Sequence, residues 1–525
     1  QLASESWKST LSDVCGKTSL DDFAPREPLS KKSLFDYRFE PPSTEMEKVV
    51  AGLWSEILEV PEVGRGDGFF ALGGDSLLAT RLVARLRGRG ISGAKLSRLL
   101  EGPSLADFSS TLSFGGMASQ LGVSEDIEHR FDPFPLTEVQ EAYWIGRSSD
   151  FMLGGIPTLF GVERLAEESE LPCLEEAWNK LVRRHEMLRA IIQPDGRQRI
   201  LRDVPYYRIS MVDAKGDDSE EEKLSAIRGE MKLSTLDCSS WPLFDIRMVK
   251  TAEEARLIAV FDTMIVDGSS MLTLLAEWNE LVESPHRELC PLGLSFRDYV
   301  TQIEPDPGRL AESERYWFDR VDSLAPAPAL PLVVDPGLVG KPSFRRLEHR
   351  LNPDDWQAIT EKAKKQDVTP SVVLLACYAE ILAKAACQGD LTISLTLFDR
   401  PPSLPEAERV VGDFTSLVLV ECSLRPEDTW LGFLRRVQDR VWSDLDHREV
   451  SGIRVLREMA SRGSHLAKAM PVVFTSMLGV GSSLAREAIW PDNAWSQTPQ
   501  VWLDHQVVET SSGVILTWDF VKELF

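Results

Sequence analysis

The stretch Phe261-Asp-Thr-Met-Ile-Val-Asp-Gly-Ser-Ser270 decides how the larger part of this chain folds. The apolar residues before it predict a buried strand, and Met271 to Val282 follows with helical periodicity behind a Ser269/Ser270 cap. Asp262 and Asp267 would point to opposite faces of a regular strand, so both face one cavity only if the chain turns between them. A strand-to-helix turn with two carboxylates is a candidate reaction centre. The alternative is that one aspartate stabilises the turn and the other caps the helix.

The composition bounds the kind of protein. With 525 residues, the chain is expected to form more than one domain, and we expect three compact units. A formal net charge of -24 argues against nucleic acid or an anionic membrane as the main partner, since both attract clustered Lys and Arg. No apolar run in the sequence is long enough to span a bilayer. The seven cysteines are scattered without a CxxC pair, which indicates reduced thiols in a cytoplasmic protein and no metal site.

The two ends of the chain indicate a piece of a longer protein. The sequence begins at Gln1 instead of a methionine and opens without a signal peptide. Asp519 to Phe525 has a helix-like pattern that stops abruptly. Residues 1–40 are polar with scattered prolines, so we interpret them as a linker or as the tail of a preceding domain.

Residues 41–113 have the pattern of a small bundle of four helices. Thr44-x-x-Glu47 forms a capping box, and further helices are predicted at residues 77–86 and 104–112. Ser76 lies at a helix start after two glycines and an aspartate. Its hydroxyl would be exposed there, and the helix dipole would favour a phosphate group beside it. The alternative is that Ser76 only caps the helix.

The rest of the chain predicts one large two-lobed unit. Residues 114–128 lack periodicity and form a predicted linker, which lets the bundle search one side of its neighbour. Residues 129–525 mix helices with apolar strands, which indicates an α+β fold. Strands are predicted at residues 391–397, 417–420, 471–476 and 497–504, the last ending at Asp504. A cluster of prolines near residue 305 marks a change of lobe. We therefore predict two similar lobes, at about residues 129–304 and 305–525.

The segment Leu72-Gly-Gly-Asp-Ser-Leu77 resembles the phosphopantetheine-attachment motif of acyl and peptidyl carrier proteins. The resemblance covers residues 41–113 and makes Ser76 the modified serine. It implies 4'-phosphopantetheine as a covalent cofactor on Ser76 and a phosphopantetheinyl transferase as a partner.

Seven segments resemble the heterocyclisation domain of nonribosomal peptide synthetases, over essentially all of residues 129–525. They are the Phe261 to Ser270 stretch, Phe134 to Arg147, Arg184 to Leu188 with Asp195 to Gln198, Thr369 to Ser371, Gly412 to Thr415, Pro471 to Ser476, and Gln497 to Asp504. Each segment alone is a weak signal, whereas seven in the order expected for the family are a strong one.

The aspartates distinguish two branches of that family. Ordinary condensation domains carry an HHxxxDG motif whose second histidine assists amide formation. In this chain Asp262 and Thr263 occupy the two histidine positions, and none of the seven histidines falls in the motif. Without an imidazole, the turn has no ordinary base of suitable pKa. The DxxxxD pattern, Asp262 to Asp267, is the cyclisation variant of the family.

The resemblance implies two chloramphenicol-acetyltransferase-like lobes in a V-shaped pseudo-dimer, crossed by a tunnel. One carrier presents a donor acyl or peptidyl thioester at one mouth, and a second carrier presents Cys, Ser or Thr at the other. The amine attacks the thioester, and the side chain then attacks the new amide. Loss of water leaves a thiazoline or a (methyl)oxazoline.

The resemblance also assigns the catalytic residues, since the Thr and Asp that carry cyclodehydration in the family match Thr475 and Asp504. Asp504 could shuttle protons if partial burial raises its pKa toward neutrality. The Thr475 hydroxyl could then orient the carboxylate or the substrate oxygen. Taken alone, the two residues could instead be a strand-end threonine and a surface aspartate.

In this interpretation, the turn from Asp262 to Ser270 has a structural role instead of a catalytic one. Asp262, Asp267 and Ser270 form the active-site motif and shape the centre. We expect one of the two aspartates to pair with a buried arginine such as Arg147 or Arg400. No metal is implied.

Other functions remain open at this point. A condensation domain that forms only the amide is the nearest alternative, and the missing histidine argues against it. A non-catalytic docking scaffold would need no Thr475/Asp504 pair, and an acetyltransferase that uses coenzyme A would need no fused carrier. The expected partners are an upstream module or domain of the same synthetase and a downstream acceptor carrier. The donor acyl group and the choice among Cys, Ser and Thr stay undetermined.

Overall fold

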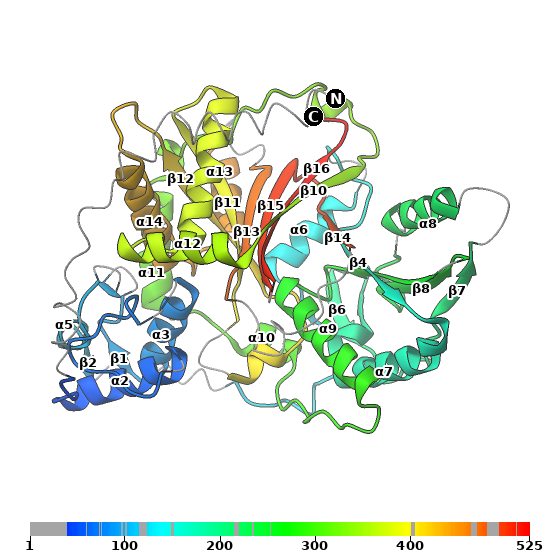
Figure 1. Ribbon diagram of the computed structural model, residues 1–525, viewed down its shortest axis with the longest axis horizontal. Coiled ribbons are helices and arrows are strands. Elements are labelled where there is room, and N and C mark those ends of the chain that lie inside the picture. Colours follow the sequence, from blue (N-terminus) through cyan, green and yellow to red (C-terminus); the bar gives the residue numbers. More distant parts are fainter. Residues whose placement is uncertain are drawn as a thin grey trace.

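The computed structural model describes residues 39–58, 60–72, 74, 76–95, 98–99, 102–114, 123–148, 152–214, 220–233, 236–252, 254–400, 405–463, 470–479, 493–510 and 512–525. All but the last two residues of the predicted segment 1–40 therefore lie outside the described residues. The described part has an N-terminal helical bundle beside a larger part that contains two main sheets (Figure 1). This mixture of helices and sheets agrees with the predicted α+β class.

The N-terminal bundle has three described helices and a short two-stranded sheet. They are α2 (Glu45–Leu58), α3 (Ser76–Gly88), α5 (Leu105–Ser110), β1 (Ile91–Ser92) and β2 (Ser113–Phe114). The fully buried Trp54 ring forms the centre, 5.2 Å from the Phe69 ring and 6.3 Å from the Phe108 ring. The remaining helix of the expected four would fall near residues 96–101, of which only 98–99 are described.

The first main sheet has the strand order β14-β4-β9-β8-β7. Its strands are β4 (Leu159–Ala166), β7 (Ser210–Asp213), β8 (Phe244–Lys250), β9 (Ala255–Asp262) and β14 (Asn493–Gln497). Trp178 of α7 (Leu171–Arg184) packs on this sheet, with its ring 5.1 Å from Phe244 and 5.6 Å from Phe261. The Trp278 ring of α9 (Gly268–Glu283) lies 4.7 Å from Trp178, so α7 and α9 cover the same face.

The second main sheet has the strand order β10-β16-β15-β13-β11-β12. Its strands are β10 (Phe344–Leu351), β11 (Asp390–Phe398), β12 (Thr415–Ser423), β13 (Val472–Met477), β15 (Leu503–Thr510) and β16 (Gly513–Val521). Tyr378 of α13 (Pro370–Ala386) lies 6.2 Å from Phe474 and 4.9 Å from His505, measured between rings. Helix α13 therefore covers the face to which these two side chains point. Because side chains alternate along a strand, Thr475 and Asp504 point to the opposite face.

A third, smaller sheet and several further helices complete the described elements. The sheet has the order β3 (Phe134–Pro135), β6 (Arg197–Ile200), β5 (Ala190–Ile192). The other α-helices are α6 (Glu138–Gly146), α8 (Glu220–Leu233), α10 (Phe296–Gln302), α11 (Pro307–Phe318), α12 (Pro353–Lys365), α14 (Trp430–Asp446) and α15 (Gly452–Ser461). Short 3₁₀ helices span Glu168–Glu170, Glu186–Arg189, Val321–Ser323, Pro336–Leu338 and Pro405–Arg409.

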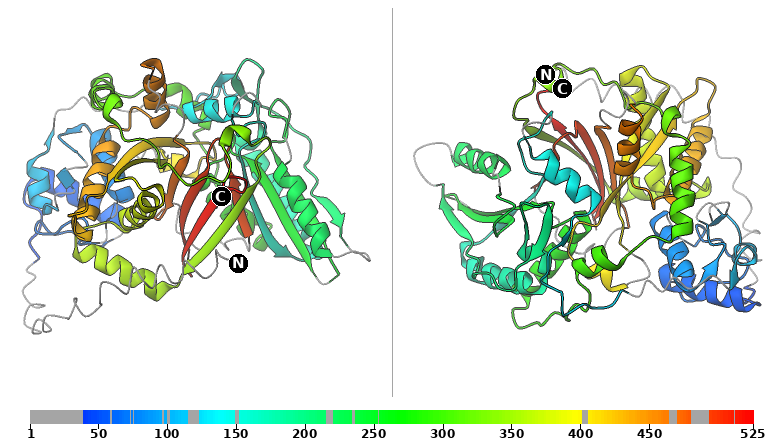
Figure 2. Two further views of the ribbon diagram at one scale, coloured as in Figure 1. Left: turned by 90° about the horizontal axis from the view of Figure 1, so that it is seen from above. Right: turned by 180° about the vertical axis from the view of Figure 1, so that it is seen from behind.

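Strand β14 joins the two halves, because it comes late in the chain but pairs antiparallel with β4 of the first sheet. Trp495 of β14 lies directly opposite Gly161 of β4. A Cβ atom on Gly161 would lie only 2.1 Å from Cε2 of Trp495, so the indole needs a glycine at this position. Figure 2 shows the two main sheets side by side and inclined to each other, in agreement with the predicted V-shaped pair of lobes.

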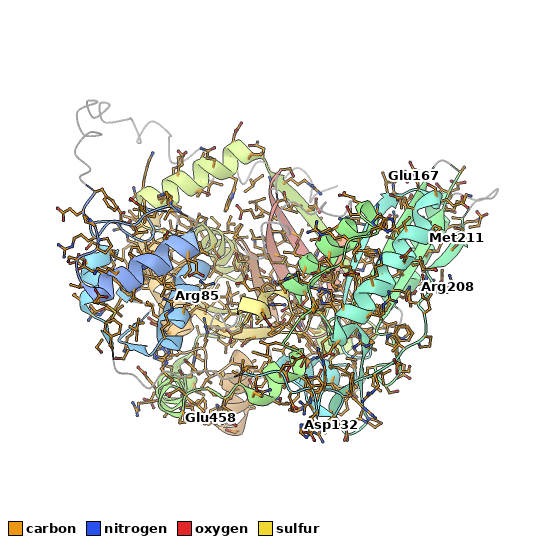
Figure 3. All side chains as sticks on the ribbon, turned by 90° about the horizontal axis from the view of Figure 1, so that it is seen from below. Arg85, Asp132, Glu167, Arg208, Met211 and Glu458 are labelled. Carbon is orange, nitrogen blue, oxygen red and sulfur yellow. The ribbon has the colours of Figure 1, made fainter. Side chains whose placement is uncertain are left out.

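The N-terminal bundle contacts the half that contains the second main sheet. The Phe70 ring stacks on Trp442 of α14 with 6.0 Å between ring centroids and 14° between planes. The Arg87 guanidinium lies 3.5 Å from the Asp446 carboxylate, and Lys95 lies 3.6 Å from Glu312. Figure 3 shows the bundle, marked by Arg85, and the edge of the first sheet, marked by Met211, toward opposite ends of the molecule.

Three local expectations are wrong. Helix α9 begins at Gly268 with Asp267 as its N-cap, so Ser269 and Ser270 are inside the helix and do not cap it. The predicted strand from Gln497 to Asp504 is two strands, because β14 ends at Gln497 and β15 begins at Leu503. The helix-like pattern at the C-terminal end is strand up to Val521, where Asp519 and Phe520 pair with β10 and β15.

Within the described part of the chain, no single helix is long and apolar enough to cross a membrane, although the bent pair α12 and α13 passes the same length and composition test together.

Candidate active site

The Asp262–Ser270 turn leads from the central strand of the first sheet into α9. Asp262 is the last residue of β9, and Asp267 caps α9 by accepting a hydrogen bond from the Ser270 backbone N–H at 2.7 Å. Both carboxylates are buried. The backbone therefore turns between them, as their spacing requires.

The carboxylate of Asp267 binds residues from the other half of the molecule. Arg400 donates from Nη1 to Oδ2 of Asp267 at 2.7 Å and from Nη2 to Oδ1 at 2.9 Å. The Phe414 backbone N–H also donates to Oδ2, at 3.2 Å. This bidentate pairing neutralises the buried carboxylate and ties α9 to the segment that precedes β12.

Ser270 adds a second connection to the same segment. Its Oγ donates to the Gly412 carbonyl oxygen at 2.9 Å and accepts from the Gly412 backbone N–H at 3.1 Å. Arg400 Nη2 also donates to this Oγ, at 2.8 Å. The Gly412–Thr415 segment and the aspartate turn, which are far apart in the sequence, are thus one hydrogen-bonded unit.

Asp262 has its own arginine. The Arg147 guanidinium at the end of α6 donates to Asp262 Oδ2, and the Met264 backbone N–H donates to Oδ1 at 3.0 Å. The expectation that one aspartate pairs with Arg147 or Arg400 is confirmed, and each aspartate has one of the two arginines. Both carboxylates are thus held by an arginine and by backbone N–H groups.

Thr475 and Asp504 lie on neighbouring strands of the second main sheet. Strands β13 and β15 are parallel, and the register places Thr475 opposite Gln506, two residues beyond Asp504. Thr475 Oγ1 lies 3.3 Å from Asp504 Oδ1 and 3.0 Å from Thr396 Oγ1 of β11. The two residues named from the sequence are therefore in hydrogen-bond contact, although Asp504 begins a strand instead of ending one.

The surroundings of Asp504 raise the pKa of its carboxyl group to near neutrality. Burial raises the pKa of Asp504 to about 7, and the carboxylate of Asp519 acts in the same direction. Hydrogen bonds from Gln506 and Thr475 and the charge of Arg346 oppose this rise. The residue remains partly exposed, so a reactant can approach it. Near neutral pH both the acid and its conjugate base are populated, as a group that accepts and returns a proton requires.

His505 is adjacent in sequence but faces the other way. Its ring stacks on Trp518 with 4.6 Å between centroids, and its Nδ1 lies 2.8 Å from the Thr517 carbonyl oxygen. Burial lowers the pKa of His505 to about 4. The imidazole is therefore a packed, neutral ring in the core and does not replace the histidine that the turn lacks.

The turn and the Thr475/Asp504 pair adjoin each other. Gly268 packs so closely on the second sheet that a Cβ atom would lie 2.9 Å from Phe398 Cζ and 3.0 Å from Met477 Sδ. Met477 is two residues beyond Thr475 and points to the same face of β13. Burial and the charges of Asp413, Asp504 and Asp267 all raise the pKa of Tyr143, so this α6 side chain lies near both parts.

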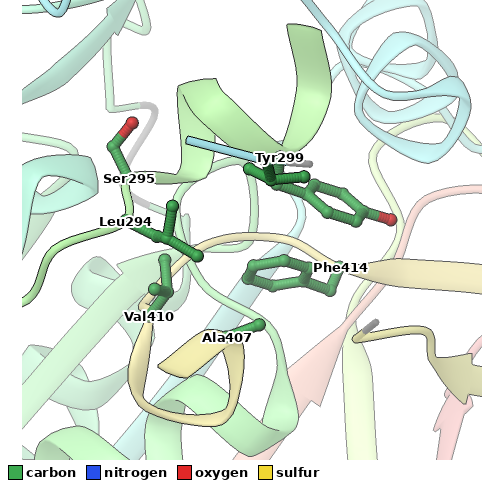
Figure 4. A pocket seen from close by; sticks show the side chains of 7 residues that line it. Leu294, Ser295, Tyr299, Ala407, Val410 and Phe414 are labelled. Atoms are coloured by element: carbon green, nitrogen blue, oxygen red, sulfur yellow. The ribbon is translucent and has the colours of Figure 1, made fainter. Parts of the chain in front are cut away.

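The small cavity in Figure 4 is not the reaction site. It is lined by Leu294, Ser295, Tyr299, Ala407, Val410 and Phe414, together with Val123. Its volume is only ≈ 10 Å³, about the space of one water molecule. One of its lining residues, Phe414, also contacts Arg400. The Arg400 guanidinium carbon is 4.3 Å from the centre of the Phe414 ring.

The predicted attachment residue Ser76 is the first residue of α3. Its side chain and the neighbouring Gly73 and Asp75 lie outside the described residues. Gly74 is described, and a Cβ atom there would lie 2.4 Å from the Phe69 ring. The close approach explains why a glycine precedes the helix start, where the first backbone N–H groups suit a phosphate ester. Among the described residues, no cluster of three or more His, Cys, Asp or Glu side chains could hold a metal ion.

Sequence reasoning missed the polar side chains around Asp504. Gln506, Asp519, Arg346 and Ser496 form hydrogen bonds with Asp504 or with one another. The alternation of β15 could have indicated Gln506, which lies two residues from Asp504 on the same face. Arg346 and Ser496 belong to strands whose register does not follow from sequence pattern.

Comparison with known families gives two matches. Residues 133–478 match the condensation domain family, and residues 48–112 match the phosphopantetheine attachment site family. The first match covers more than half of the chain.

Known proteins agree with these matches. The chain is 33% identical over 504 residues to bacitracin synthase 1 of Bacillus licheniformis, covering 93% of this chain and 10% of that protein. It is 31% identical over 473 residues to phenyloxazoline synthase MbtB of Mycobacterium tuberculosis, covering 86% of this chain and 32% of that protein. The chain thus spans no more than about a third of the length of either curated relative.

A solved structure shares the fold. The cyclization-docking bidomain of the nonribosomal peptide synthetase EpoB from Sorangium cellulosum superposes with a TM-score of 0.70 at 33% identity, covering 76% of this chain and 82% of that one. The predicted fold, with a carrier followed by two acetyltransferase-like lobes, agrees with this likeness. The chain therefore belongs to the condensation-domain family of nonribosomal peptide synthetases, with a phosphopantetheine-binding carrier domain ahead of the condensation-type domain.

Proposed function

We propose that residues 129–525 form a heterocyclisation domain. The domain joins a carrier-bound donor thioester to carrier-bound Cys, Ser or Thr, and then closes and dehydrates the product to a thiazoline or a (methyl)oxazoline. The observation that carries this proposal is the contact between Thr475 Oγ1 and Asp504 Oδ1, 3.3 Å apart, beside the aspartate turn. The names of two similar proteins support it, since one is a phenyloxazoline synthase and the other contains a cyclization domain.

The first step needs little from the protein beyond positioning. The amine of the acceptor residue attacks the carbonyl carbon of the donor thioester, a C–N bond forms and the C–S bond breaks. The amine proton leaves with the departing thiolate. Holding two reactants in contact supplies much of the rate in such transfers, which is consistent with a turn that has no histidine.

Asp504 carries the second step in this proposal. The thiol or hydroxyl of the joined residue attacks the new amide carbon, and its proton passes to the Asp504 carboxylate. Asp504 returns that proton to the former carbonyl oxygen. The C–O bond then breaks as the N–H proton passes by the same route to the leaving hydroxyl. One water leaves, its two hydrogens come from the heteroatom and the nitrogen, and a C=N bond remains.

Thr475 orients this chemistry. Its single O–H group lies within hydrogen-bond distance of both Asp504 Oδ1 and Thr396 Oγ1, so it can accept from one neighbour while it donates to the other. We assign Asp262, Asp267 and Ser270 a shaping role, because their polar groups are engaged by Arg147, Arg400 and the Gly412 backbone.

We propose the division 41–113 for the carrier domain, 114–128 for the linker and 129–525 for the heterocyclisation domain, with its lobes meeting near residue 305. Residues 1–40 would then be a linker or the tail of a preceding domain. The family matches at 48–112 and 133–478 support these limits.

The carrier would receive 4'-phosphopantetheine on Ser76 from a phosphopantetheinyl transferase. The group, once attached, supplies the thiol that bears the donor as a thioester. Because the carrier precedes the heterocyclisation domain, we propose that it serves the donor side. A carrier loaded with Cys, Ser or Thr would approach from downstream.

The test is a reconstitution with the full chain. The chain is converted to its holo form with coenzyme A and a broad transferase, loaded with an acyl donor, and mixed with an acceptor carrier that bears Cys, Ser or Thr. Mass spectrometry of the acceptor should show a product one water lighter than the linear condensation product. If every acceptor yields only the linear product, the domain forms amides and the proposed function is wrong.

A further inference from the structure

Four side chains form a closed set of hydrogen bonds beside Asp504. Gln506 Nε2 donates to Asp504 Oδ2 at 2.6 Å and to Ser496 Oγ at 2.8 Å. Ser496 Oγ donates to Asp519 Oδ2 at 2.7 Å, and Arg346 Nε donates to Asp519 Oδ1 at 2.7 Å. Arg346 Nη2 donates to Gln506 Oε1 at 3.3 Å and completes the set. These side chains come from four strands, β10, β14, β15 and β16.

Strand register explains the arrangement. Asp504 lies directly opposite Asp519 in the antiparallel pair of β15 and β16, and Asp519 lies directly opposite Arg346 in the pair of β16 and β10. Directly opposed residues share a face of the sheet, and so do residues two apart on one strand, which brings Gln506 to that face as well. Ser496 reaches the same point from β14, the strand that belongs to the first sheet.

The amide of Gln506 has only one possible orientation. Arginine can only donate, so the amide atom that faces Arg346 must be the oxygen. The nitrogen then faces Asp504, and both of its N–H groups are used, one for Asp504 and one for Ser496. Asp504 Oδ2 is therefore an acceptor in both charge states of the carboxyl group. The proton that Asp504 gains and loses belongs on Oδ1, the oxygen that lies 3.3 Å from Thr475.

We propose that Gln506, Ser496, Asp519 and Arg346 form a positioning unit that holds Asp504 Oδ2 and leaves Oδ1 as its working oxygen. This inference rests on the proposed function, in which Asp504 moves the protons of ring closure. None of the four residues needs to touch the substrate. Their role is to keep one oxygen of Asp504 directed at Thr475 and the reacting atoms.

Charged and titratable groups face Asp504 from several elements. Asp519 of β16 and Arg346 of β10 are the nearest charges, and they form an ion pair with each other. Tyr143 of α6 is a buried phenol whose pKa is raised, so it is neutral at pH 7, and the buried Tyr378 of α13, on the other face of the sheet, also has a raised pKa. Lys232 at the end of α8 interacts with Asp519 instead. Asp519 is thus the group whose charge can be removed to alter Asp504 specifically.

The first test replaces Gln506, which forms hydrogen bonds with Asp504, Ser496 and Arg346. Gln506→Leu keeps the approximate volume but cannot hold Oδ2. We expect amide formation at the parent rate and ring closure slower by about 10- to 100-fold, the cost typical of misplaced reacting groups. Gln438→Leu is the matched control, because this buried glutamine bridges the Thr369 N–H and the Asp367 carbonyl on the α13 side of the same half. The control should not change the ratio of ring product to linear product.

The second test uses a readout that a purely structural role would not change. Asp519→Asn keeps the shape and removes a negative charge beside Asp504, so ionisation of Asp504 becomes easier. The midpoint of the pH profile for ring closure should therefore move to lower pH, by on the order of one unit. The direction is the same whether the acid or the base form limits the rate. This variant also tests the unit if Gln506→Leu does not fold.

The outcomes separate this inference from the function on which it rests. If the unaltered chain makes no ring product, the proposed function fails and the positioning unit fails with it. If the unaltered chain makes the ring, the inference alone is overturned by either of two results. One is a folded Gln506→Leu variant that loses amide and ring formation in parallel, or loses neither. The other is an Asp519→Asn profile whose midpoint stays in place or moves to higher pH.

Discussion

Three aspartates near the junction of the two sheets differ in what neutralises their charge. Asp262 and Asp267 are each paired with an arginine, whereas Asp504 has a hydrogen-bonded glutamine and a second carboxylate beside it. Removing one partner of such a buried ion pair is strongly destabilising, so both pairs hold structure in place. Burial raises the pKa of Asp504 to about 7, and this supports the proposed proton-moving role of Asp504 beside the proposed shaping role of the other two.

Asp267→Ala should damage amide formation and ring closure together. It leaves the Arg400 guanidinium, which is 8% exposed, without its carboxylate, and breaking such a buried pair typically costs about 3–5 kcal/mol of folding free energy. The measurement is a denaturant melt alongside product formation. Asp322→Ala is the control, since Asp322 pairs with Arg462 on the surface and its loss should change stability little. An Asp267→Ala variant that forms the amide at full rate and fails only to close the ring contradicts the shaping role.

Thr475→Val should slow ring closure less than loss of the Asp504 acid does. The valine keeps the shape and deletes the hydroxyl that lies between Asp504 and Thr396. Linear product should accumulate on the acceptor carrier, as followed by mass spectrometry over time. In a double variant that carries Thr475→Val and Asp504→Asn, the two defects in ring closure should be less than additive, because the residues act on the same proton. Fully additive defects would mean that they act separately.

The identity of these site residues follows from sequence more readily than their contacts. Asp262 and Asp267 stand at a fixed spacing in a strand-to-helix turn, and a carboxylate at a helix start predicts a cap. The pairing of both with arginines was only partly expected, because Arg147 and Arg400 are distant in the chain. Gln506 could have been inferred from strand alternation once Asp504 was known, whereas Asp519 carried no signal in the sequence, since a polar residue on a strand is equally common on a solvent-exposed face.

At the level of elements, β14 is the critical connection. It crosses from the second half to the first sheet and brings Ser496 to the Asp504 face. Gly161→Ala should displace the Trp495 ring, which lies 2.1 Å from the position of the new Cβ, and weaken the pairing of β14 with β4. We expect a lower melting temperature and reduced ring closure.

The chain offers a matched control for that substitution. Gly229 lies inside α8, and no atom lies within 4 Å of the position that a Cβ would take there, so Gly229→Ala adds the same methyl group without a clash. Alanine favours a helix over glycine by about 1 kcal/mol, so this variant should be as stable as the parent or more stable. Equal melting temperatures for the two variants would show that β14 does not depend on the close approach at Gly161.

Strand β14 also shows a feature of the fold that local sequence pattern did not predict. Apolar runs predicted β9, β11, β12 and β13 correctly, because buried strands need apolar residues on both faces. The run from Gln497 to Asp504 has apolar residues only at Val501 to Leu503, and a turn divides it, with Gln500 at a φ of 65°. Assigning β14 and β15 to different sheets depends on pairing partners far away in the chain, which local composition does not encode.

At the scale of the whole molecule, the described contacts between the carrier and the half that contains the second sheet include an aromatic stack and two ion pairs. The Phe70–Trp442 stack is an apolar contact and the Lys95–Glu312 pair is exposed, whereas the Asp446 carboxylate that pairs with Arg87 is buried. The exposed Lys95–Glu312 pair contributes little, so we expect the Phe70–Trp442 stack and the Arg87–Asp446 pair to hold the carrier. Phe70→Ala should release it, and small-angle scattering should show a larger radius of gyration. An unchanged radius, with the bundle still folded, would mean that other contacts hold the carrier.

The central claim is that Asp504 moves the protons of ring closure. The most direct test is a time course of the acceptor-bound product with Asp504→Asn, which keeps size and hydrogen bonding but removes the titrating proton. We predict that the linear product forms at the parent rate and that the product one water lighter appears more slowly by about 10²- to 10⁴-fold, the range typical of a general acid or base. If the variant yields the dehydrated product at the parent rate, Asp504 is not the proton carrier and the account is wrong.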